Sequence, residues 1–136
     1  MDRKTLQAIN AIESLKGRYF RGLDTKDWDT VDSTLAKEAV VDTTALGGDR
    51  VIGAANYVAL LKQDSENTTV HHGHTPEIQL SSPSRATGTW AVQALVIGSD
   101  GKRELCVGHD HDSYVLRDGQ WLIAATRSTR LHEDKA

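Results

Sequence analysis

An aspartate and a histidine far apart in the sequence could form a catalytic pair. Asp24 follows the run YFRGL at residues 19–23, and His71 lies in the segment VHHGH at residues 70–74. A carboxylate beside an imidazole fixes the ring tautomer and stabilises the imidazolium that forms when the ring removes a proton. In an apolar pocket this chemistry suits elimination of water or halide, or migration of a double bond. The alternative is a helix cap and an unrelated strand histidine, because sequence separation says nothing about contact.

Tyr19, Trp90 and His72 are further candidates for a pocket around this pair. Tyr19 lies a little over one helical turn before Asp24, so both side chains could point the same way. Its phenol could donate a hydrogen bond to a substrate carbonyl and stabilise an enolate, although a core aromatic with a satisfied hydroxyl is an equal alternative. We expect Trp90 to line the cavity and His72 to bind substrate.

A polar segment, GHDHDSY at residues 108–114, could supply more substrate contacts. If it is a strand, alternation places Asp110, Asp112 and Tyr114 on one face and the two histidines on the other. We expect the carboxylates and Tyr114 to face the pocket, with Arg127 or Arg130 as the partner that a buried aspartate requires. The alternative is a wet outer face or a subunit contact.

Five histidines in these segments raise the question of a metal ion. They are His71, His72, His74, His109 and His111. Two histidines at positions i and i+2 of a strand can share a zinc ion. However, the sequence has no cysteine-ligand spacing, no His-Glu-x-x-His helix and no two-histidine, one-carboxylate pattern. It also lacks a glycine-rich phosphate loop. We therefore expect no metal and no organic cofactor.

Hydrophobic periodicity predicts the elements that would position these side chains. Apolar residues recur at steps of three and four from residue 4 to 23, and a second helix would carry Trp28, Val31 and Leu35. A third helix is expected at residues 54–62. Strands are expected at about residues 38–44, 50–52, 69–80, 85–97, 103–116 and 120–131. The charged end, residues 132–136, is expected to be frayed.

Helices first and long hairpin-linked strands afterwards predict one α+β domain over residues 1–136. Three helices of the N-terminal half would pack on a strongly curved sheet, and the resulting cone would enclose a pocket. The net charge of -3, with scattered basic residues, argues against nucleic acid as a partner. The single cysteine excludes an internal disulfide, and no apolar run is long enough to span a membrane. No secretory signal follows the first residues, so a cytoplasmic location is expected.

Four motifs resemble one known family. They are YFRGLD followed by KDW at residues 19–28, VHHGH at 70–74, GHDHDSY at 108–114 and DGQWLI at 118–123. Together with the order of the elements, they resemble the nuclear-transport-factor-2-like superfamily, and more narrowly its SnoaL-like branch. That branch includes scytalone dehydratase, bile-acid 7α-dehydratase and hexachlorocyclohexane dehydrochlorinase. The resemblance covers nearly the whole chain and implies a cone-shaped α+β barrel with a mixed, mostly antiparallel sheet.

The resemblance also implies roles for individual residues. Asp24 and His71 stand where these relatives carry the catalytic dyad. Tyr19 resembles a pocket tyrosine that the bile-acid enzyme has five residues before its aspartate. Asp112 and Tyr114 fall on two polar residues that contact substrate in scytalone dehydratase. A further histidine of that enzyme falls near Val96 here, so its route for protonating the leaving group is not evident in this chain.

The leading hypothesis is a cofactor-free lyase or isomerase that acts on a small hydrophobic cyclic substrate, such as a polyketide, steroid or terpenoid intermediate. His71 would abstract a proton and Asp24 would orient the imidazole. One alternative is a non-catalytic small-molecule-binding or assembly module of the same fold. Another is a metal-dependent hydrolase that uses the histidines. Because members of the family often associate through the outer face of the sheet, the resemblance also implies a homo-oligomer, a dimer or a trimer.

Overall fold

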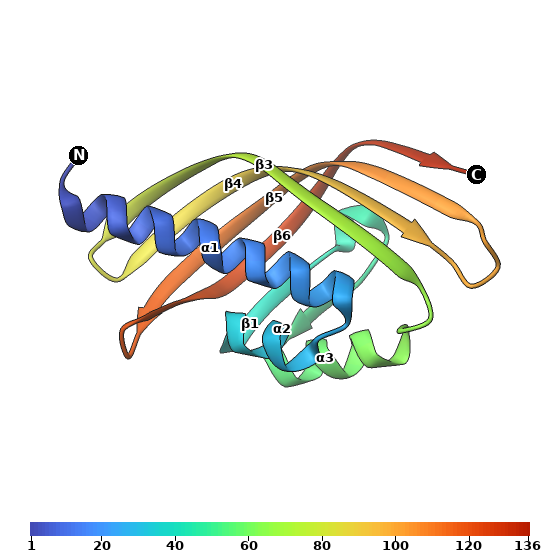
Figure 1. The fold of residues 1–136 in the computed structure, drawn as a ribbon, viewed down its shortest axis with the longest axis horizontal. Helices are drawn as coiled ribbons and strands as arrows, with labels where there is room; N and C mark the ends of the chain where they lie inside the picture. Colours follow the sequence, from blue (N-terminus) through green and yellow to red (C-terminus); the bar gives the residue numbers. More distant parts are fainter.

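The computed structural model describes residues 1–136 and consists of three helices packed on one six-stranded sheet (Figure 1). The helices are α1 (Arg3–Thr25), α2 (Trp28–Thr34) and α3 (Ala54–Gln63), with a short 3-10 turn, η1 (Thr44–Leu46). The strands are β1 (Leu35–Asp42), β2 (Arg50–Ile52), β3 (Thr68–Ser82), β4 (Arg85–Ile97), β5 (Arg103–Arg117) and β6 (Gln120–Lys135). No helix combines the length and apolar character needed to cross a lipid bilayer.

Helix α1 is set by its caps and its apolar face. The Asp2 side chain accepts a hydrogen bond from the Thr5 N–H at 2.7 Å, which satisfies one free amide of the first turn. The helix ends at Thr25, and Lys26 caps it with a left-handed φ of 58° that turns the chain into α2. Gly22 makes this turn compact, because a Cβ there would lie 2.9 Å from Val31 Cγ2. The two helices therefore pack closely where α1 ends.

The sheet has the order β2-β1-β6-β5-β4-β3. All neighbouring strands are antiparallel except β1 and β6, which are parallel. Figure 1 shows the long strands curving around α1, and the sheet does not close, so β2 and β3 are its edges. The predicted α+β cone with a mixed, mostly antiparallel sheet is confirmed.

The hydrophobic core fills the space between α1 and the concave face of the sheet. Ile12 and Leu15 of α1 are buried together with Ile123 of β6 and Val115 of β5. These α1 positions follow the step of three and four that predicted the helix. The core therefore holds the first helix against the strands that carry the polar motifs.

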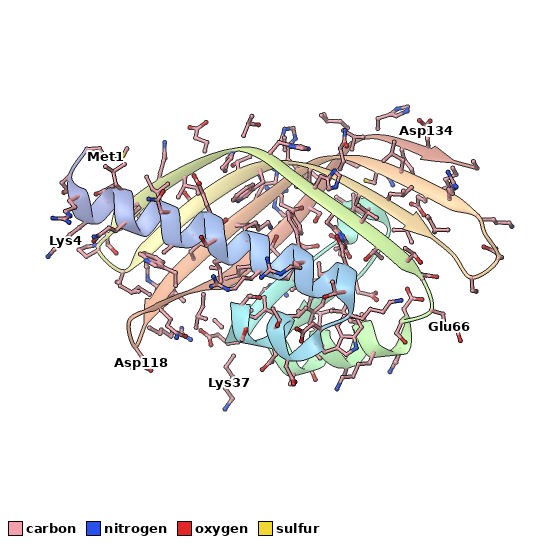
Figure 2. The ribbon with its side chains drawn as sticks, viewed as in Figure 1. Met1, Lys4, Lys37, Glu66, Asp118 and Asp134 are labelled. Carbon is pink, nitrogen blue, oxygen red and sulfur yellow. The ribbon has the colours of Figure 1, made fainter.

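The largest differences from the predicted boundaries are at the start of β1 and the end of β6. Helix α2 ends at Thr34, and β1 begins at Leu35 rather than near residue 38. The expectation of a frayed end is wrong, because β6 continues to Lys135 and pairs with β5 (Figure 2, where Asp134 is labelled). The pairing reaches Ala136, whose N–H donates to the Arg103 carbonyl at 2.8 Å. Charge alone does not unfold a segment whose backbone pairs with a neighbouring strand.

Candidate active site

A close contact between α1 and β3 brings the predicted pair together. Gly73 of β3 permits this approach, because a Cβ there would lie 2.7 Å from the Phe20 ring and 3.2 Å from the Trp90 ring. The Phe20 ring stacks on the His71 imidazole with a centroid distance of 5.4 Å and an angle of 9°. The end of α1, which carries Asp24, is thereby placed directly over the start of β3.

The Asp24 carboxylate accepts three hydrogen bonds from β3. His71 Nδ1 lies 2.7 Å from Asp24 Oδ1, and the His71 backbone N–H donates to Asp24 Oδ2 at 2.8 Å. The Thr69 hydroxyl donates to Oδ1 at 3.0 Å. Because an ionised carboxylate only accepts, Nδ1 must carry a proton, so in the neutral tautomer of the imidazole the lone pair lies on Nε2. Thr69 was not predicted, although it lies two residues before His71 on the same face of a strand.

Competing effects set the pKa of Asp24. Burial raises it, but hydrogen bonds from the His71 ring and backbone, the charge of His71 and the Thr69 hydroxyl together hold the pKa below its ordinary value. The carboxylate is therefore ionised at neutral pH and favours a positive charge on the imidazole. The two side chains stay 23% and 21% exposed, so the pair is within reach of a ligand.

The His71 ring forms part of the wall of a cavity of about 130 Å³ inside the cone. Tyr19 and Phe20 of α1, Tyr57 of α3 and apolar residues of β1 and β4 line the same cavity. The Tyr19 and Tyr57 hydroxyls lie 3.1 Å apart. Burial raises the pKa of both phenols, so each stays a neutral hydrogen-bond donor at physiological pH. Tyr57 was predicted only as part of a helix face, and no local signal placed it beside Tyr19.

A second polar cluster lies behind the cavity. Lys16 of α1 is fully buried, with its Nζ 3.0 Å from Asp110 Oδ2 and 2.8 Å from Asp112 Oδ2. The expectation that Arg127 or Arg130 is the partner of a buried aspartate is wrong. The last strand turns Arg130 toward Glu133, whereas α1 crosses the inner face of β5 and delivers Lys16 there.

The same cluster extends to two aromatic side chains, Tyr114 and Trp90. The Tyr114 hydroxyl donates to Asp112 Oδ2 at 2.7 Å and accepts from the Trp90 Nε1–H at 2.9 Å. Burial and the negative charge of Asp112 raise the pKa of Tyr114, so its phenol stays protonated. At the other end, the Ser128 hydroxyl donates to Asp110 Oδ1 at 2.8 Å. One chain of hydrogen bonds thus links β4, β5, β6 and α1.

The structure separates the predicted site residues into two groups. Tyr19 and His71 line the cavity, and Asp24 contacts His71. The four predicted substrate-binding residues, Asp112, Tyr114, Trp90 and His72, do not form part of this cavity wall. The first two are buried in the cluster behind it, while the last two border a groove between α1 and β3 on the other side of the His71 ring. Their contact with substrate stays a prediction.

The expected faces of β5 hold. Asp110, Asp112 and Tyr114 are buried on the inner face, as alternation predicted. The His109 and His111 rings are neighbours, as expected of residues that share the other face. His109 also contributes to the cavity wall.

Histidine pairs do not assemble into a metal site. The His72 and His74 rings lie 6.2 Å apart, and those of His109 and His111 lie 6.3 Å apart, on two strands separated by β4. Nowhere do three or more His, Cys, Asp or Glu side chains come close enough to hold one ion. A metal-dependent hydrolase therefore has no ligand set among these residues.

Known proteins share this architecture. A family model described as the SnoaL-like domain matches residues 4–127. A structure from Novosphingobium aromaticivorans DSM 12444, provisionally assigned as a scytalone dehydratase, superposes with a TM-score of 0.90 at 20% identity, covering 98% of this chain and 91% of that chain. A type 2 hexachlorocyclohexane dehydrochlorinase (LinA) gives 0.90 at 18% identity, with 100% and 93% covered. The type 3 LinA of Novosphingobium barchaimii LL02 gives 0.89 at 17%, with 100% and 94% covered. At these identities the likeness concerns the fold.

Proposed function

Because the chain belongs to the SnoaL-like domain family, as its resemblance predicted, we propose that it is a cofactor-free lyase or isomerase. In this proposal His71 removes a proton from carbon in a small hydrophobic cyclic substrate. The observation that carries it is the 2.7 Å contact between Asp24 Oδ1 and Nδ1 of His71, a residue that lines the cavity. A base with a free Nε2, an orienting carboxylate and a mostly apolar enclosure are the parts that carbon deprotonation needs.

The proposed step begins with transfer of a substrate proton to His71 Nε2. The carbon–hydrogen bonding pair moves toward an adjacent carbonyl, whose oxygen gains negative charge. Tyr19 and Tyr57 line the cavity as neutral phenols that share one hydrogen bond, so the hydroxyl that accepts this bond keeps its own proton to donate to that oxygen. Asp24 stabilises the imidazolium. In an elimination, Nε2 returns the proton to the departing hydroxyl, which leaves as water; in an isomerisation, it returns the proton to a different carbon.

The size of the cavity narrows the substrate class. Its volume of about 130 Å³ is close to that of an engineered cavity, roughly 150 Å³, which holds one benzene molecule. Of the polyketide, steroid and terpenoid intermediates that the family resemblance implies, the cavity favours those whose reacting part is a single six-membered ring.

Dehydration of 3-hydroxycyclohexanone to 2-cyclohexenone and water tests the proposal directly, because the enone is followed by its absorbance. We expect His71→Gln to lower the rate by about 10²- to 10⁴-fold, the usual contribution of a general base. His132→Ala is the matched control, because His132 lies on an exposed part of β6 outside the cavity. Equal rates for His71→Gln and the parent protein would remove His71 as the base. If one-ring hydroxy ketones bind without turnover, the non-catalytic binding module replaces the lyase.

Asp24→Asn tests the pair without a substrate. All three groups that face the carboxylate are donors, so an asparagine amide must place its NH₂ against one of them. The backbone N–H of His71 cannot accept, so the NH₂ is expected at the Oδ1 position. His71 Nδ1 would then have to accept, and the ring proton would move to Nε2. Nitrogen-15 NMR of the ring reads this tautomer change. An unchanged tautomer would contradict the orienting role of Asp24.

A further inference from the structure

One acidic side chain reaches the cavity wall besides the groups of the proposed reaction. Asp110 lines the cavity, and its side chain keeps 10% exposure, whereas the Asp112 side chain has none. The lining includes no lysine and no arginine, and most of the remaining wall is apolar or carries neutral hydroxyl groups. A carboxylate in such a wall is costly unless it is paired.

Asp110 is held in place by one donor on each oxygen. Lys16 Nζ donates to Oδ2 at 3.0 Å, and the Ser128 hydroxyl donates to Oδ1 at 2.8 Å. A carboxylate oxygen has two lone pairs, so each oxygen of Asp110 can accept one more hydrogen bond. The fixed carboxylate is thus an unsaturated acceptor at the edge of the cavity.

The charge of the cluster is not balanced. Lys16 is one ammonium between two carboxylates, and Asp112 Oδ1 accepts no hydrogen bond within the protein. Burial lowers the pKa of Lys16, but the negative charges of Asp112 and Asp110 outweigh this and raise it, so the ammonium stays charged. One formal negative charge is left over, and Asp110 is the member that presents it to a ligand.

We propose that Asp110, positioned by Lys16 and Ser128, determines the specificity of the cavity: its carboxylate binds a hydroxyl group of the ligand and excludes anionic ligands. This rests on the proposed function only in taking the cavity as the substrate site. A neutral one-ring alcohol supplies the donor that Asp110 lacks. A ring carboxylate of similar size would bring a second negative charge into a space of low dielectric constant.

Binding of three one-ring probes tests the proposal without turnover. Cyclohexanol carries a donor, fluorocyclohexane has a similar size without a donor, and cyclohexanecarboxylate carries a charge. We expect NMR titration of the parent protein to show cyclohexanol binding about 10- to 100-fold more tightly than either other probe, the range for a hydrogen bond to a charged group. Absence of saturable cyclohexanol binding, or equal affinity for all three probes, would overturn the proposal.

Asp110→Asn is the decisive variant. It leaves Lys16 in a one-to-one ion pair with Asp112, so the cluster carries no excess charge. Because no buried charge loses its partner, we expect the variant to keep its fold. We expect the preference for cyclohexanol over cyclohexanecarboxylate to shrink to within about threefold, because the charge that excludes the acid is gone. A change in stability alone would lower all three affinities together and leave the ratio intact, which would overturn the proposal.

Ser128→Ala keeps the charge of Asp110 and removes only one of its donors. The preference for cyclohexanol is expected to persist in this variant, and its loss would mean that the charge is not the determinant.

The lyase proposal and the Asp110 inference can fail independently of each other. If the protein binds cyclohexanol more tightly than the other two probes but does not dehydrate 3-hydroxycyclohexanone, the Asp110 inference is supported and the lyase proposal is refuted. If the ketone is dehydrated but the probes bind equally, the lyase stands and the Asp110 inference falls.

Discussion

Two contacts between a carboxylate and a nitrogen base lie next to the Phe20 ring and differ in burial but hardly in length. Asp24 Oδ1 and His71 Nδ1 are 2.7 Å apart, with both side chains more than one-fifth exposed. Lys16 Nζ and Asp112 Oδ2 are 2.8 Å apart, with both side chains fully buried. The Phe20 ring stacks on His71, and Lys16 Nζ lies 4.8 Å from its centroid.

The difference in burial predicts different uses. Asp24 has a lowered pKa, so its ionised form contributes stability above its ordinary value of 3.8, and this is lost as the pH falls below that value. Lys16 has a raised pKa, so its contribution is complete below 10.5 and is lost only as the pH rises through the higher folded value. The Asp24 carboxylate and the Lys16 ammonium are both charged at neutral pH. Only the exposed one can exchange a proton with a ligand at low cost, while the buried one fixes geometry and charge.

Removal of Lys16 should have the largest effect. Lys16→Met leaves two carboxylates buried without a cation, and breaking a buried pair in this way costs about 3–5 kcal/mol of unfolding free energy. Urea unfolding measures the loss. Lys37→Met is the matched control, because Lys37 is exposed and projects away from the fold in Figure 2.

The triple variant Lys16→Met/Asp110→Asn/Asp112→Asn separates charge from packing. It should recover most of the stability lost in Lys16→Met, because no uncompensated charge is left. If Lys16→Met costs less than about 1 kcal/mol, the value of an exposed pair, the two contacts do not differ as their burial implies.

Tyr114→Phe should have an intermediate effect on the same buried cluster. It removes the acceptor of the Trp90 Nε1–H and one donor to Asp112 without changing a charge. Leaving a buried polar group without a partner costs about 1–3 kcal/mol, again measured by urea unfolding. Tyr19→Phe is the control, since it removes a single contact, to Tyr57, at the cavity wall. An equal loss in both variants would mean that the hydrogen bonds of Tyr114 with Trp90 and Asp112 add nothing to stability beyond a single contact at the cavity wall.

The sequence predicted the exposed contact better than the buried one, for physical reasons. The spacing of apolar residues in a helix and the alternation of side chains in a strand are local patterns. They placed the first helix and the inner face of β5 correctly. The family resemblance supplied the pairing of Asp24 with His71. Lys16 carries a local signal that periodicity of apolar residues does not detect: it stands four residues after Ile12 and four before Phe20, on the buried stripe of α1. A lysine on such a stripe indicates a buried anion on the facing strand.

Other features depend on tertiary contacts that no local pattern encodes. Tyr57 reaches Tyr19 because α3 packs against α2 and β1, and no spacing in the sequence specifies that approach. The C-terminal strand forms because β5 pairs with it as far as Lys135, which outweighs the charged composition of residues 132–136. In both cases the partner lies far along the chain, so propensity alone gave an incomplete answer.

Replacement of Asp24 should have the smallest effect on stability, and one that depends on acidity. Asp24→Ala is expected to cost on the order of 1 kcal/mol at neutral pH, because the carboxylate is partly exposed and water can replace some of its hydrogen bonds. Since the folded pKa lies below 3.8, this cost should be complete above that value and should shrink as the pH falls below it. Urea unfolding of parent and variant at a series of pH values measures the difference. Asp49→Ala, which removes an exposed carboxylate, should leave the pH profile unchanged. A cost that stays constant into acid would mean that β3 does not hold Asp24 in its charged form, and the contrast with Lys16 would then be one of burial alone.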